Sequence, residues 1–114
     1  MSAAPRPLRL LECCLYAQNL DAAADFYQRV LGFSPVSRAA GRHVFFRVGE
    51  AMLLLFQPER TAESEDVPPH GTSGPGHVAF AVDSEALTSW KLRLHGTHVL
   101  VVGVTGAGKG SVLW

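Results

Sequence analysis

The sequence is poor in cysteine, has no net charge and contains no long apolar run. Its two cysteines, Cys13 and Cys14, are neighbours, so on a strand they would point to opposite faces and are not expected to pair. Two free thiols are typical of a reducing compartment, and we expect a cytoplasmic location. No apolar stretch approaches the roughly 20 residues that cross a bilayer, so no membrane partner is expected.

The charge balance excludes a general electrostatic attraction to polyanions. Lys plus Arg and Asp plus Glu each number 10, which gives a formal net charge of zero. Neither nucleic acid nor an anionic membrane is therefore expected as a partner. The same balance offers little repulsion between copies, and 47% hydrophobic residues favour association, so we expect a homodimer.

The first half of the chain has a β-α-β-β-β pattern. A short apolar stretch over residues 10–17 predicts a strand. Apolar residues at i, i+4 and i+8 over 21–32 predict an amphipathic helix that ends at a glycine. Three strand-like stretches follow over 33–38, 42–48 and 51–57. Short glycine-containing turns between these strands favour antiparallel hairpins.

A polar segment rich in Pro and Gly, residues 58–75, predicts a loop or linker. The pattern then begins again, with a strand over 76–82, a helix capped by Asp83 or Ser84, and an apolar strand over 98–102. The chain is therefore predicted to be a single α+β domain with a complete βαβββ module, a linker and an incomplete second βαβ(β) module, which span 8–58, 58–75 and 76–114.

Three stretches resemble the vicinal oxygen chelate superfamily: "LECCLYAQNLDAAADFYQRVLGF", "GRHVFFRVGEAMLLLFQPE" and "GPGHVAFAV". That superfamily includes glyoxalase I, extradiol dioxygenases, and fosfomycin- and bleomycin-resistance proteins. The resemblance covers residues 8–90, and "NLDAAADFYQRVLGF" is its most specific part. It implies a cupped mixed sheet in which two βαβββ units surround a divalent metal. A small substrate would chelate that metal through adjacent oxygens.

The resemblance also implies a set of metal ligands. Glu12 stands at the ligand position of the first strand, where the family usually has His, and His77 stands at the equivalent position of the second unit. A carboxylate and an imidazole suit Zn, Fe, Mn or Ni. Leu54 stands at another ligand position and cannot bind metal, while the last ligand would lie beyond Trp114. Two protein ligands predict weak metal binding.

Each candidate has an ordinary structural alternative. Glu12 could pair with Arg42 or Arg47, because burying an unpaired carboxylate costs several kcal/mol. His77 could be a hydrogen-bonded core histidine. His43 and Arg47 are four residues apart on one predicted strand and therefore share a face. They would either bind an anionic substrate in the cup or form a solvated face.

Three aromatic residues are given structural roles. Phe45 and Phe46 are neighbours on one predicted strand, so they point to opposite faces, and we expect core packing. His70 lies in the Pro- and Gly-rich segment and is expected to be exposed.

The last segment, "WKLRLHGTHVLVVGVTGAGKGSVLW", resembles the Walker A region of FtsK/SpoIIIE-type DNA translocases over residues 90–114. This second resemblance implies a chimeric, truncated or engineered sequence. Glycine N–H groups cradle phosphates in such loops, a Lys reaches the β- and γ-phosphates, and a hydroxyl holds Mg²⁺. The candidate nucleotide-binding residues are Gly103, Gly106, Gly108, Lys109 and Ser111.

A phosphate loop also needs a helix after it, and only residues 111–114 remain in the sequence. That length is too short for a helix to hold itself, so ATP hydrolysis is not expected. The glycine-rich end would otherwise be a tail or an edge strand that completes the sheet.

Three functions follow from these patterns. The first is a metal-binding protein of the vicinal oxygen chelate class, with a small chelating substrate, an incomplete site, and lyase or dioxygenase chemistry. The second is a non-catalytic, resistance-type module that binds a small molecule in its cup. The third is a nucleotide-binding fragment of a DNA translocase.

Overall fold

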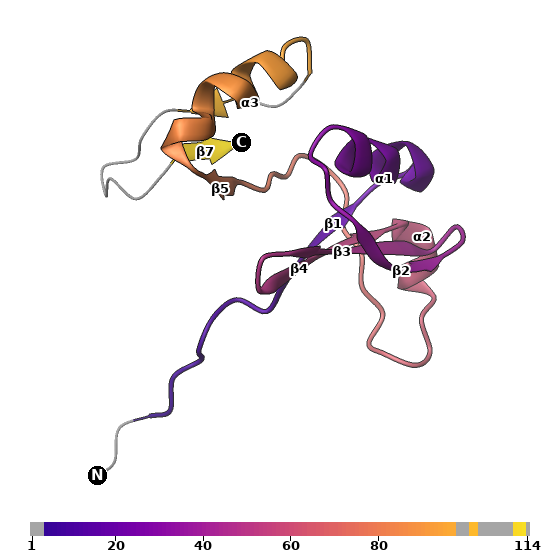
Figure 1. Cartoon of the computed structure of the whole chain (residues 1–114). Helices are drawn as coiled ribbons and strands as arrows, with labels where there is room; N and C mark the ends of the chain where they lie inside the picture. Colours follow the sequence, from indigo (N-terminus) through magenta and orange to yellow (C-terminus); the bar gives the residue numbers. More distant parts are fainter. Residues whose placement is uncertain (1–3, 98–100, 103–110, 114) are drawn as a thin grey trace. The chain divides into compact units, whose positions relative to one another are not determined.

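The protein is seen in a computed structural model that describes residues 4–97, 101–102 and 111–113 (Figure 1). The chain divides into two compact units, Met1–Ser73 and Gly74–Trp114, and each is described by itself. Within the described residues, no helix combines the length and the apolar character needed to cross a bilayer.

The first unit has the βαβββ order that the sequence predicts. Its elements are β1 (Glu12–Tyr16), α1 (Leu20–Arg29), β2 (Pro35–Ala39), β3 (His43–Val48) and β4 (Ala51–Phe56). The strands form one mixed sheet in the order β1-β4-β3-β2. β1 runs parallel to β4, and the β2–β3 and β3–β4 pairs are antiparallel, as the predicted hairpins require.

Helix α1 is defined by local signals at both ends. The side chain of Asn19 accepts a hydrogen bond from the backbone N–H of Ala22 at 3.1 Å and caps the first turn. Asp25 and Arg29 form an ion pair at 2.7 Å one turn apart. Gly32 then adopts a φ of 75°, a left-handed conformation that glycine accepts without strain. The helix therefore ends at Arg29, three residues before the predicted end.

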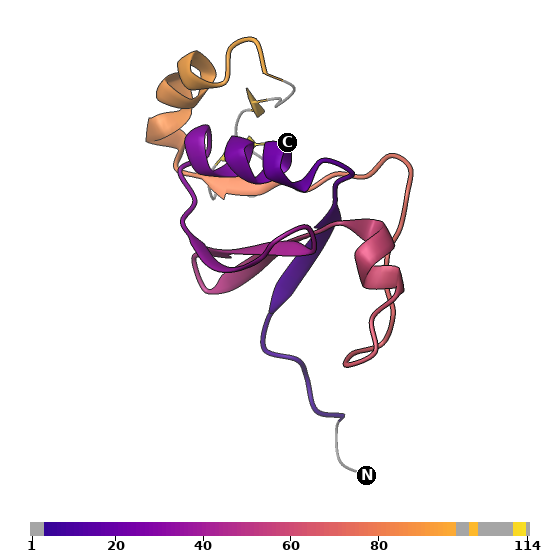
Figure 2. The same ribbon diagram turned by 90° about the vertical axis from the view of Figure 1, so that its right-hand side faces the viewer.

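Helix α1 lies over one face of the sheet, as Figure 2 shows, and the buried apolar side chains of the first unit lie between them. Side chains alternate along a strand, so Val44 and Phe46 on β3 share this face, and Leu53 and Leu55 on β4 join them. Val44, Phe46 and the helix residue Ala24 are fully buried. Burial of these side chains is the main force that holds the helix on the sheet.

The predicted loop over 58–75 begins with a short helix, α2 (Pro58–Ala62). Pro58 occupies the first turn, and the Gln57 side chain accepts a hydrogen bond from the backbone N–H of Arg60 at 3.0 Å. Thr61 is fully buried, and its carbonyl accepts a hydrogen bond from the backbone N–H of His70 at 3.1 Å. Five residues are too few for a periodic apolar pattern, which is why the sequence did not predict this helix.

The second unit forms a three-stranded antiparallel sheet in the order β5-β7-β6. The strand expected over 76–82 begins only at Phe80. The C-terminal strand lies between the other two strands, so the expectation of an edge strand is wrong for the described residues. The elements are β5 (Phe80–Val82), the 3-10 helix η1 (Ser84–Ala86), α3 (Leu87–Arg93), β6 (Val101–Val102) and β7 (Ser111–Leu113).

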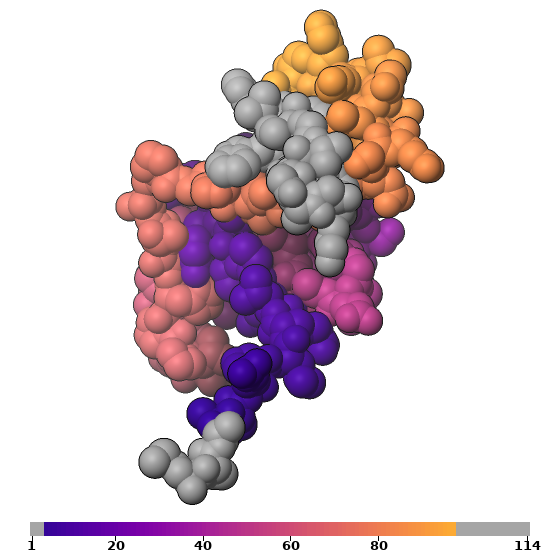
Figure 3. Space-filling model, turned by 90° about the vertical axis from the view of Figure 1, so that its left-hand side faces the viewer, coloured from indigo at the N-terminus to yellow at the C-terminus, as the bar shows by residue number. Residues whose placement is uncertain are grey.

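The segment that precedes β1 projects from the first unit, as the indigo atoms in Figure 3 show. Leu8 and Leu10 are 92% and 87% exposed. The strand predicted from Leu10 therefore begins two residues later, at Glu12, where pairing with Met52 on β4 starts.

Candidate functional site

The candidate site lies on the face of the first sheet that is turned away from α1, which we call the distal face. Strand register places Glu12, Met52 and Arg47 in one row across β1, β4 and β3. Because side chains alternate along a strand, His43 shares this face with them. The next rows across the three strands are Cys14, Leu54 and Phe45, and then Tyr16, Phe56 and His43.

Glu12 is exposed at the beginning of β1. Within the described part of the chain its carboxylate forms no ion pair, so the structural alternative, a pair with Arg42 or Arg47, is wrong. Met52 separates Glu12 from Arg47 in the row, and two strand spacings of about 4.8 Å hold their backbones about 10 Å apart. The carboxylate is therefore free to receive a ligand.

His43 is held in a single tautomer by two neighbours. The guanidinium Nη1 of Arg42 donates a hydrogen bond to His43 Nδ1 at 2.7 Å. Because arginine has only donors, Nδ1 must accept, and the imidazole proton lies on Nε2, which is 3.3 Å from the Ser37 hydroxyl. Burial and then the Arg42 charge lower the pKa of His43 below its ordinary value. His43 is thus a neutral hydrogen-bond donor on the distal face.

We expect the substitution Arg42→Gln to raise the pKa of His43. The substitution removes the guanidinium charge, whereas the burial that contributes more to the lowered pKa remains. In the wild type the unfolded chain takes up this proton more readily, so stability falls as the pH drops below the ordinary value of 6.5. This loss should shrink in the variant. NMR titration of the imidazole measures the pKa, and Arg47→Gln is the matched control; equal pKa values in wild type and Arg42→Gln would contradict the assignment.

His70 lies against the distal face, contrary to the expectation that it is exposed. Its Nδ1 is 2.9 Å from the Tyr16 hydroxyl, and its ring stands edge-on to Phe56 with centroids 4.6 Å apart. Arg42 lies over the same Phe56 ring, 5.7 Å from its centroid. These side chains form a wall at one end of the distal face. The sequence could not predict that His70 contacts the sheet, because this contact depends on the path by which the segment after α2 comes back to β1 and β4.

The two cysteines are free, as expected, and both are exposed. Cys14 lies on the distal face between Glu12 and Tyr16. Burial raises the pKa of the Cys14 thiol, and the charge of Glu12 and then Cys13 raise it further. Since the thiolate is the reactive form, Cys14 is not a candidate nucleophile at neutral pH.

The predicted metal ligands come from different units. Glu12 belongs to the first unit, and His77 lies in the exposed stretch before β5 in the second. Leu54 is buried on β4, where it stands beside Cys14, and offers no ligand atom. Over the described ranges, no group of three His, Cys, Asp or Glu side chains is placed to hold a metal ion. The donor chemistry of Glu12 and His77 suits a divalent ion, but these two residues are fewer than the usual three protein ligands.

Residues 9–111 match the sequence model of the Glyoxalase/Bleomycin resistance protein/Dioxygenase superfamily. No match is found among the curated proteins. The chain is 38% identical to a lactoylglutathione lyase from Agrobacterium tumefaciens, with a TM-score of 0.76, and the match covers 85% of this chain and 75% of that one.

Two further solved structures share the fold. A glyoxalase/bleomycin resistance protein/dioxygenase from Nocardioides is 26% identical, with a TM-score of 0.63 and coverage of 87% of this chain and 67% of that one. A mutant fosfomycin resistance protein from Listeria monocytogenes, in complex with Mn(II) and 1S,2S-dihydroxypropylphosphonic acid, is 16% identical. Its TM-score is 0.59, and the match covers 84% of this chain and 69% of that one.

The resemblance of residues 90–114 to DNA translocases finds no support. The glyoxalase match runs through residue 111 and thus includes most of this segment. A phosphate loop needs a helix N-terminus after its lysine, whereas Ser111 begins strand β7. The other candidate nucleotide-binding residues lie outside the described residues: Gly103, Gly106, Gly108 and Lys109.

The family match and the structural likeness agree over the same part of the chain. The sequence model spans almost all of the 114 residues, and the fold of the first unit is the βαβββ unit that the resemblance implies. The chain therefore belongs to the Glyoxalase/Bleomycin resistance protein/Dioxygenase superfamily.

Proposed function

We propose that this protein binds a small anionic or oxygen-chelating molecule on the distal face, together with a divalent metal, and acts as a lyase of the glyoxalase class. One observation carries the proposal. Glu12, His43 and Arg47 share the distal face, and the Glu12 carboxylate has no ion-pair partner among the described residues. The face thus combines an exposed carboxylate, which could bind a cation, with the basic side chains of His43 and Arg47, which could bind an anionic substrate.

The choice of a lyase rests on the relative from Agrobacterium tumefaciens. That protein is a lactoylglutathione lyase, and it is similar enough in sequence to indicate related chemistry as well as a shared fold. A divalent metal held at the Glu12 carboxylate would supply Lewis-acid polarisation of a substrate oxygen, and His77 of the second unit is the other candidate ligand. Dioxygenase chemistry and a non-catalytic, resistance-type binding role are the alternatives within the same superfamily.

The other side chains of the distal face would bind and position the substrate. The exposed guanidinium of Arg47 would pair with an anionic group of the substrate, because arginine binds carboxylates and phosphates through paired donors. His43 would donate a hydrogen bond through Nε2, in place of its 3.3 Å contact with the Ser37 hydroxyl, while Arg42 occupies Nδ1. The edge of Phe56 and the Tyr16–His70 pair would bound the substrate on one side.

We expect Glu12→Ala and His77→Ala each to weaken the binding of Mn²⁺ or Zn²⁺ by at least about tenfold. Loss of even an outer partner of a metal ligand costs 10–100-fold in affinity, so loss of one of two ligands should cost no less. Metal analysis of the purified protein and calorimetric titration measure the effect. Glu50→Ala is the matched control, because Glu50 is also exposed but lies in the β3–β4 turn.

The outcomes separate the candidate functions. Unchanged metal affinity in Glu12→Ala would contradict the proposed ligand set. Formation of S-lactoylglutathione by the metal-loaded protein would establish the lyase. A metal-free protein that still binds small anionic ligands would instead be a non-catalytic binding module. Homodimer formation and a cytoplasmic location stay predictions from the sequence.

A further inference from the structure

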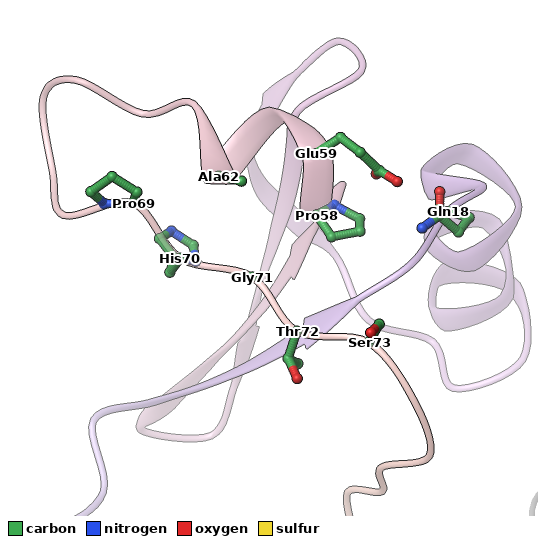
Figure 4. A pocket seen from close by; sticks show the side chains of 9 residues that line it. All are labelled: Gln18, Pro58, Glu59, Ala62, Pro69, His70, Gly71, Thr72 and Ser73. Atoms are coloured by element: carbon green, nitrogen blue, oxygen red, sulfur yellow. The ribbon is translucent and has the colours of Figure 1, made fainter.

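The first unit contains a second candidate binding site beside α2, away from Glu12 and Arg47. It is an open pocket of about 480 Å³ between α2, the segment 69–73 and the connection from β1 to α1. We call it the α2 pocket (Figure 4). The lining residues that matter below are Gln18, Pro58, Glu59, Ala62 and Pro69.

The α2 pocket carries a single formal charge. Glu59 is the only carboxylate in its lining, and the lining contains no Lys or Arg. Glu59 forms no ion pair with the residues that the structure describes. Hydrogen bonds from the Gln18 side chain, from the backbone N–H of Glu59 and from Gln57 lower the pKa of this carboxyl, so it is ionised at neutral pH. The pocket is therefore negative and has no resident counter-ion from its own lining.

The Glu59 carboxylate is held in position by its neighbours. Gln57 Nε2 donates a hydrogen bond to Glu59 Oε2 at 2.6 Å, while Gln57 Oε1 accepts one from the backbone N–H of Arg60 at 3.0 Å. Figure 4 shows the Gln18 amide and the Glu59 carboxylate pointing toward each other. A carboxylate has about four acceptor positions, so three hydrogen bonds leave roughly one for an outside donor.

Part of the remaining lining is suited to a short apolar chain, while His70, Thr72 and Ser73 add polar groups. Pro58, Ala62 and Pro69 present rigid or small apolar surfaces next to the carboxylate. Gly71 holds the opposite wall close, because a Cβ at this position would stand 3.2 Å from the Pro58 carbonyl oxygen. A side chain there would force the two walls apart by a few tenths of an ångström.

We propose that the α2 pocket binds a small organic cation, namely a primary alkylammonium group. Its N–H would donate to the remaining acceptor position of Glu59, and its alkyl chain would lie against Pro58 and Pro69. The proposal does not rest on the proposed function of the distal face, because Glu59 belongs to neither the candidate metal ligands nor the substrate-binding residues, although His70 borders both sites.

The test uses n-butylammonium as the probe and follows the backbone amide signals of the full chain by NMR. We expect saturable shifts of residues 57–73 in the wild type and at least about tenfold weaker binding in Glu59→Gln, because a hydrogen bond to a charged group is lost. Gln keeps the shape of Glu, and Glu59 is exposed, so the variant should fold. Glu65→Gln is the matched control, since Glu65 is an exposed acid of the same segment that does not line the pocket.

Two comparison ligands complete the experiment. Butan-1-ol and butyrate have the same chain length with no charge or the opposite charge, and both should bind more weakly than the ammonium. Equal binding of butyrate, equal affinity in Glu59→Gln and wild type, or an equal loss in Glu65→Gln would each overturn the proposal. Added salt should weaken binding of the ammonium, since the pocket is open to solvent and exposed charges are screened.

Discussion

Replacing Phe46 with alanine is expected to lower the free energy of unfolding by about 3–5 kcal/mol. The Phe46 ring is fully buried between the sheet and α1. Its centroid lies 6.1 Å from the ring of Tyr27 and 6.1 Å from that of Phe33, so alanine would leave a cavity bounded by two aromatic rings. Urea denaturation followed by circular dichroism measures the loss as a lower midpoint with an unchanged slope.

Phe45→Ala is the matched control for this prediction. Phe45 is the next residue on β3, but its ring lies on the distal face, where it stacks on His43 with centroids 4.0 Å apart and is only half-buried. The loss of stability should be clearly smaller than for Phe46. Equal losses in the two variants would contradict the assignment of Phe46, and not Phe45, to the core under α1.

The second large effect is expected from Ala24→Leu, which should destabilise the protein by about 1–3 kcal/mol. Ala24 lies in the middle of α1 and is fully buried against the sheet. A larger side chain cannot enter this packed interface unless the helix moves or neighbouring side chains leave their preferred rotamers. Thermal unfolding of the variant measures the cost as a lower Tm.

Ala22→Leu makes the same chemical change two residues earlier on the same helix. Ala22 is exposed, so its replacement should change stability by no more than about 0.5 kcal/mol. Similar effects at both positions would mean that α1 presents another face to the sheet.

The fold of the first unit could be predicted because its signals are local. Apolar spacing and Gly32 indicated helix α1, and short glycine turns indicated the antiparallel strands. The resemblance implied a mixed sheet, but the parallel pairing of β1 with β4 was not predicted, because no local pattern encodes contact between strands separated by α1, β2 and β3. Helix α2 was missed because its five residues are held by Gln57 and Thr61 and not by a repeated apolar stripe.

The candidate site was predictable in part. Strand alternation was enough to place His43 and Arg47 on one face, and the resemblance drew attention to Glu12. The hydrogen bond from Arg42 to His43 could not be predicted, because neighbours on a strand point to opposite faces. Arg42 lies in the turn before β3, and its long side chain reaches the His43 ring from there. The glycine-rich end was misleading for a related reason. Its residues match the pattern of a phosphate loop, but phosphate binding needs a helix N-terminus after the lysine, and the backbone at Ser111 is extended.

The return of His70 to the first unit also changes how the two units are tethered. In the sequence, the connection between the two sheets runs from the end of β4 at Phe56 to the start of β5 at Phe80. Because the His70 backbone N–H donates to the Thr61 carbonyl and the His70 ring is bonded to Tyr16, the chain is anchored to the first unit at residue 70, and residues 71–79 make the connection to β5.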